Sequence, residues 1–161
     1  MGKLRPACRT LCDEYLGRIR RYGPLVEREV RAAGKARTAE LARREEGARL
    51  AAAIPARTRV VALERDGTPW SSEDLARQLA RWLEGASDLC LLIGGAAGLD
   101  PGVVRQAGAR WSLGPLTLPH ELARVVVVEQ WYRAWTILRG EPYHRGGQGC
   151  HRETGRAGRT P

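Results

Sequence analysis

An apolar strand that runs directly into two glycines is the feature that most constrains this chain. Residues 91–93 are all apolar, and Gly94 and Gly95 follow at once. An uninterrupted apolar run is typical of a strand that is covered on both faces, as in parallel sheets. Glycine lets the backbone turn sharply and lets a ligand approach it closely. The feature therefore predicts an α/β fold with a ligand-binding turn after a central strand.

Strands and helices alternate along the rest of the chain. Ser71 with Asp74 three residues later predicts a capped helix start, and Asp100-Pro101 predicts another. We expect strands at 25–31, 59–64, 88–93 and 111–113, helices at 6–22, 36–53, 71–84, 100 onward and 120–138, turns at 67–69 and 114–119, and an extended end at 141–145. This order predicts a parallel sheet flanked by helices.

Five short pieces in the second half of the chain together resemble one known family. They are LLIGGAAGL at 91–99, WSL at 111–113, LTLPH at 116–120, YRAW at 132–135 and PYHR at 142–145. Their order and spacing resemble the SPOUT-class RNA methyltransferases, and more narrowly the ribosomal RNA large subunit methyltransferase H family, which methylates N3 of a pseudouridine. The resemblance covers roughly residues 2–145 and implies one SPOUT domain over 1–145 with a C-terminal trefoil knot.

The resemblance implies a cofactor, S-adenosyl-L-methionine, held against the strand and the two turns. The residues it assigns to this site are Leu63, Gly95, Gly114, Pro115, Leu116, Thr117, Leu118 and Pro119. Strand ends present ligands in α/β sheets, and irregular backbone leaves N–H and C=O groups free to contact adenine. Ordinary strand-to-helix turns are the structural alternative. The family also implies a homodimer with a shared active site, and large-subunit ribosomal RNA in the assembled ribosome as the substrate.

The polar C-terminal residues are the candidates for catalysis. His144 is the leading candidate for the base, Tyr143 can stack on or hydrogen-bond the target base, and Arg145 and Arg133 can hold phosphate. A salt bridge to Glu129, one helical turn earlier, is the alternative for Arg133 and brings Glu129 into the candidate set. For His120, at the start of the last helix, a capping or packing role and a substrate contact are both open.

Charge and cysteine content indicate which partners and which cellular compartment to expect. The net charge is +9, with +6 in residues 1–37 and +3 in residues 145–161, which suggests nucleic acid or an arginine-biased composition. No leader and no membrane-length apolar run occur, so we expect a cytoplasmic protein. We expect the four cysteines to be reduced and no metal to bind; a zinc site from Cys8, Cys12, Cys150 and His151 is the alternative.

Two departures from the family remain. The family begins with a strand just before the residues that appear here as Gly2-Lys3. Either the true start codon lies further upstream, which we expect, or the chain lacks its first strand. Residues 146–161 are glycine-rich and lack an apolar face, which predicts a disordered tail. Two rival functions stay open: another SPOUT enzyme acting on a ribose or a tRNA base, and a non-catalytic RNA-binding protein on the ribosome.

Overall fold

A parallel three-stranded sheet forms the centre of the protein. The computed structural model describes residues 2–34, 38–85 and 88–143. The strands are β1 (Arg59–Pro69), β2 (Leu89–Leu92) and β3 (Ala109–Ser112), in the order β2-β1-β3, and both pairings are parallel. The expected α/β class and the strands near 59–64, 88–93 and 111–113 are confirmed. The trefoil knot stays a prediction.

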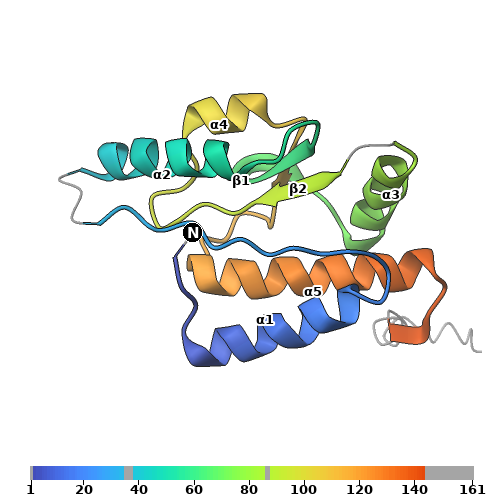
Figure 1. The fold of residues 1–161 in the computed structure, drawn as a ribbon. Helices are drawn as coiled ribbons and strands as arrows, with labels where there is room; N and C mark the ends of the chain where they lie inside the picture. Colours follow the sequence, from blue (N-terminus) through green and yellow to red (C-terminus); the bar gives the residue numbers. More distant parts are fainter. Residues whose placement is uncertain (1, 35–37, 86–87, 144–161) are drawn as a thin grey trace, which may run out of the picture.

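Helices cover both faces of the sheet (Figure 1). They are α1 (Pro6–Ile19), α2 (Ala39–Ala53), α3 (Ser72–Leu83), α4 (Pro101–Gln106) and α5 (His120–Leu138). Successive side chains of a strand point to opposite faces, so Val60 and Ala62 of β1 pack beneath α2 and α4, while Val61 packs against α3 and α5. Both faces of β1 are buried over residues 60–62, as the apolar sequence there predicts.

α1 forms an outer layer on α5. Its buried side chains Cys12, Leu16 and Ile19 pack against Val128 of α5. Since α3 and the sheet cover another side of α5, this helix is apolar on more than one face. α1 ends at Ile19, three residues earlier than expected, and a turn follows.

The predicted helix starts are confirmed by their side-chain caps. The Ser71 hydroxyl accepts a hydrogen bond from the Asp74 N–H, and the Asp74 carboxylate accepts one from the Ser71 N–H, which completes a capping box. The Ser71 hydroxyl and backbone hold the pKa of Asp74 below its ordinary value. Asp100 caps α4 by accepting from the Gly102 N–H at 2.7 Å. These local contacts stabilise the helix ends beside β1 and β2.

β1 continues through the residues expected to form a turn. Leu63 and Thr68 both align with Trp111 of β3, so the residues between them bulge out of the ladder. A Cβ atom on Gly67 would lie 2.8 Å from backbone carbons of Arg110 and Trp111. The turn prediction for 67–69 was wrong because glycine here permits a close approach to the neighbouring strand.

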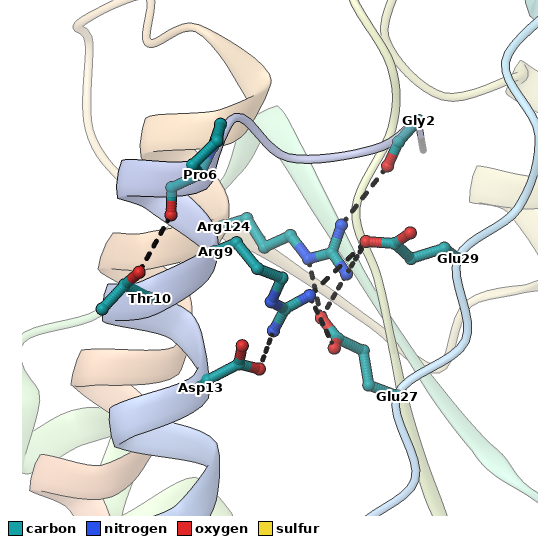
Figure 2. Close-up of polar contacts among 8 residues, drawn as sticks. All are labelled: Gly2, Pro6, Arg9, Thr10, Asp13, Glu27, Glu29 and Arg124. Carbon is teal, nitrogen blue, oxygen red and sulfur yellow. Dashed lines mark hydrogen bonds and ion pairs between the residues drawn. The ribbon is translucent and has the colours of Figure 1, made fainter.

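The strand expected at 25–31 is also absent: residues 24–34 have no regular secondary structure. Figure 2 shows what holds this segment: the buried Arg124 of α5 contacts Glu27 and Glu29, and Arg9 of α1 contacts the same two carboxylates. One backbone bond, from Gly2 N–H to the Val30 oxygen at 3.0 Å, supports it. The strand predicted here was wrong because side-chain ion pairs, and not a strand ladder, hold the segment.

In the part of the chain that the structure describes, no helix combines the length and the apolar character needed to cross a bilayer.

Candidate functional site

The expected cofactor residues come together at one edge of the sheet. Ala62 of β1 is level with Leu92 at the end of β2, and Leu63 is level with Trp111 near the end of β3. Gly95 and residues 114–119 follow these two strand ends. Parallel strands end at the same edge, where α/β sheets bind their ligands. We call Leu63, Gly95 and residues 114–119 the turn group.

Residues 114–119 are irregular, as predicted. Gly114 has φ of 100°, a conformation that favours glycine, and its N–H donates to the Ser112 hydroxyl at 3.1 Å. Within the described chain, residues 116–118 make no hydrogen bond, and Leu116 is 74% exposed. The segment therefore offers free backbone donors and acceptors beside an uncovered apolar side chain.

Gly95 packs tightly against Glu46, a residue that the sequence did not point to. It bridges to Gly98 across the turn, and a Cβ atom on Gly95 would lie 2.7 Å from Oε2 of Glu46. Glu46 of α2 is buried; its Oε1 accepts from the Ala33 N–H at 2.9 Å, while Oε2 has no partner within the described residues. Glycine at position 95 thus accommodates a buried carboxylate.

Three of the expected catalytic residues form a second group, on the second half of α5 and in the segment that follows it. The Tyr143 hydroxyl donates to Glu129 Oε1 at 3.0 Å, and Arg133 forms an ion pair with the same oxygen at 2.7 Å. The Arg133 guanidinium also lies over the Tyr143 ring, 4.8 Å from its centroid. The salt bridge that was the alternative for Arg133 is therefore present. We call Tyr143, Glu129 and Arg133 the tail cluster.

Two tyrosines of the N-terminal part of the chain hold the C-terminal segment. The Tyr15 and Tyr143 hydroxyls are 3.3 Å apart, and the Tyr22 hydroxyl donates to Glu141 at 2.7 Å. Burial, followed by the contacts with Tyr15 and Glu129, raises the pKa of Tyr143 above its ordinary value. Tyr143 is therefore a neutral hydrogen-bond donor at physiological pH. Residues 142–143 lie in a 3₁₀ turn, so the extended end expected here was wrong over these positions.

His120 does not join the tail cluster. It begins α5 beside Gly2, next to the turn group, and Glu121 after it accepts from the backbone and side chain of Arg5. Arg133 lies 13 positions further along the helix, about 20 Å at 1.5 Å per residue. Of the other candidates, His144 and Arg145 lie outside the described residues, as does the predicted tail.

The described residues contain no group of three or more His, Cys, Asp or Glu side chains that could hold a metal ion. Cys8 and Cys12 are buried in α1, and burial raises the pKa of the Cys12 thiol. Cys150 and His151, the other members of the zinc alternative, are outside the described part of the chain.

Comparison with known proteins places the chain among methyltransferases. The family model described as "Predicted SPOUT methyltransferase" matches residues 1–144. Ribosomal RNA large subunit methyltransferase H from Pseudomonas paraeruginosa (strain DSM 24068 / PA7) is 46% identical over 135 residues, which cover 83% of this chain and 87% of the relative. The protein of the same name from Polynucleobacter necessarius subsp. necessarius (strain STIR1) is 54% identical over 101 residues, 63% of this chain and 75% of the relative.

Proposed function

Because this chain belongs to the SPOUT methyltransferase family and is a ribosomal RNA methyltransferase, we propose that it transfers a methyl group from S-adenosyl-L-methionine to N3 of a pseudouridine in large-subunit ribosomal RNA. The convergence of Leu63, Gly95 and residues 114–119 at one sheet edge is the structural observation that carries the proposal. The substrate is RNA in the assembled ribosome, and the site of action is the cytoplasm.

The turn group suits the proposed cofactor. The unpaired backbone N–H and C=O groups of residues 116–118 are free to bind an adenine edge, and the exposed Leu116 offers an apolar surface for a flat ring. When bound, the cofactor supplies an electrophilic methyl group on a sulfonium. The residues of the turn group would hold and orient it beside the sheet.

The residues near the C-terminus would then bind the target base and remove its proton. In methyl transfer, N3 forms a bond to the methyl carbon as the carbon–sulfur bond breaks, and the N3 proton must leave. We assign that proton to His144. The Tyr143 hydroxyl already donates to Glu129, so Tyr143 would stack on the target base or accept a hydrogen bond from it. Positioning of the reactants can lower the activation free energy by roughly 7–11 kcal/mol. A general base accelerates the reaction by about 10²–10⁴-fold, which is a smaller effect. Holding the RNA is therefore the larger part of the task.

A homodimer would bring the tail cluster of one copy close to the turn group of the other. Glu129 lies nine positions beyond His120 on α5, about 14 Å along the axis at 1.5 Å per residue, so one copy separates its tail cluster from its own turn group. On the face of α5 that carries Glu129 and Arg133, Leu122 and Val126 are exposed. We assign this apolar stripe to a second copy of the chain, whose tail cluster would face the turn group of the first.

Methylation of purified ribosomes that lack the modification tests this function. We expect radiolabelled methyl transfer to one pseudouridine N3, identified by mapping the modified nucleoside, and loss of transfer in His144→Ala with cofactor affinity retained. Methylation of a ribose or of tRNA would favour another SPOUT activity. A chain that binds ribosomes but not S-adenosyl-L-methionine by calorimetry would be a non-catalytic binding protein.

Light scattering tests the dimer separately. We expect about twice the chain mass of 17.8 kDa, and a shift toward monomer in Leu122→Asp/Val126→Asp. A monomeric wild-type protein that still methylates ribosomes would refute the shared site.

A further inference from the structure

A basic hollow between α2 and α4 shares no residue with the turn group or the tail cluster. It has a volume of about 240 Å³ and is lined by residues of α2, of α4 and of the turn just before α4. The lining residues are Glu40, Arg43, Arg44, Asp100, Pro101, Gly102 and Arg105. α2 and α4 cover the same face of the sheet (Figure 1), so the hollow lies at a junction of two ordered elements.

The arginines of the hollow lack partners. Among the described residues, Arg43, Arg44 and Arg105 form no ion pair and no hydrogen bond, whereas seven other arginines of the chain form ion pairs. The Nε of Arg43 is buried and has no acceptor within the residues that the structure describes. A buried guanidinium N–H without a partner is costly. Arg44 and Arg105 are exposed, so their unpaired guanidinium groups can bind an anion that enters the hollow.

The carboxylates of the hollow do not cancel this charge. Three arginines against two carboxylates leave a net charge of +1. The Asp100 carboxylate is also engaged as the cap of α4, accepting from the Gly102 N–H at 2.7 Å. Arginine presents several N–H groups in one plane, a geometry that matches the oxygens of a phosphate.

The size and the place of the hollow indicate what enters it. Its volume of about 240 Å³ is below the roughly 300–1,000 Å³ of sites that enclose a whole small molecule, so it fits one anionic group of a larger ligand. Asp100, which lines it, is five positions after Gly95 of the turn group. A polyanion whose target base reaches the turn group would pass beside this hollow.

We infer that Arg43, Arg44 and Arg105 form a binding site for a backbone phosphate of the RNA substrate, next to the methyl-transfer site. The inference rests on the proposed function for the identity of the polyanion. Anionic oxygens are common to an RNA phosphate and to the carboxylate of the methyl donor, and the experiment separates these two sources. Phosphate contacts position the RNA and do not read its sequence.

The test compares Arg43→Gln/Arg105→Gln with a control of equal charge change, Arg59→Gln/Arg81→Gln, whose residues are exposed and lie outside the hollow. Binding to unmodified ribosomes is measured over a range of salt concentrations, and S-adenosyl-L-methionine binding is measured by calorimetry. For the hollow variant we expect the ribosome Kd to rise at least tenfold. We expect the slope of log K against log salt to fall by about 0.7–0.9. Cofactor affinity should stay within twofold, and the control should bind ribosomes nearly as the wild type does.

Three results would overturn the inference. The first is a hollow variant that binds ribosomes as tightly as the wild type, and the second is a control variant that loses as much ribosome affinity as the hollow variant. The third is a hollow variant that loses cofactor affinity by the same factor as ribosome affinity, which would assign the hollow to the methyl donor. If the wild-type chain methylates ribosomes while any of these results holds, this inference fails and the proposed function stands. A wild-type chain that binds no ribosomes would overturn both.

Discussion

Neutralising Glu27 tests how much the ion-pair network stabilises the N-terminal segment (Figure 2). The side chain of Arg124 is 8% exposed and that of Glu27 is 24% exposed, and Arg124 contacts Glu27 through both Nε and a terminal nitrogen. Breaking a fully buried pair costs about 3–5 kcal/mol, whereas exposed pairs contribute about 0.2–1 kcal/mol. In Glu27→Gln, Arg124 keeps Glu29 at 3.1 Å. We therefore expect an intermediate loss of about 2 kcal/mol in the free energy of unfolding, between these two limits.

Urea unfolding followed by tryptophan fluorescence measures this loss. At about 2–4 °C per kcal/mol for a chain of this size, the melting temperature of Glu27→Gln should fall by about 4–8 °C. The control is Glu14→Gln, which removes an exposed i,i+4 pair with Arg18 and should cost at most about 0.5 kcal/mol. Equal losses in the two variants would refute the argument that burial of Arg124 strengthens the network.

Three further predictions concern single contacts. Gly67→Ala should destabilise the protein by about 1–3 kcal/mol in urea unfolding, because the added methyl group would lie 2.8 Å from the backbone of β3; an unchanged midpoint would contradict the close approach. Arg5 lowers the pKa of Glu121 from its ordinary 4.5, so the stability from this ion pair is present above pH 4.5 and is lost as the pH falls through the lower, folded-state pKa. The melting temperatures of the wild type and Glu121→Gln should therefore converge on acidification. A difference in melting temperature that stays constant with pH would contradict this prediction. Burial and the hydrogen bond to Glu141 raise the pKa of Tyr22, so Tyr22→Phe should remove a late-ionising phenol from the ultraviolet alkaline titration, and an unaltered late phase would contradict the contact.

The features that could be predicted from the sequence depend on local chemistry. The caps at Ser71 and Asp100 are settled by residues one turn away, and the apolar runs of β1 and β2 need only to be buried. The position of the turn group at one sheet edge follows from parallel strand order. Its role in binding a cofactor is a proposal that rests on family membership.

The features that could not be predicted depend on contacts between distant parts of the chain. Residues 25–31 were expected to form a strand, and only the positions of Arg9 and Arg124 show that ion pairs hold this segment in place of a ladder. Glu46 is a single buried carboxylate in a charged helix, and no repeating pattern in the sequence distinguishes it from the exposed carboxylates nearby. The same holds for Arg43 and Arg105, which lie far apart in sequence and share a hollow because α2 and α4 pack on one face.

The length of α5 fixes the spacing of the proposed site. One rigid helix begins at the end of the turn group and carries Glu129 and Arg133 of the tail cluster further along. A single inserted residue near Val126 would shift everything beyond it by about 1.5 Å and rotate it by about 100°. Such an insertion leaves composition and charge almost unaltered, yet it would turn Tyr143 and its partners away from the face that we propose meets a second copy. In the proposed dimer, the number of residues in α5 is therefore as much a requirement for activity as the identity of any one of them.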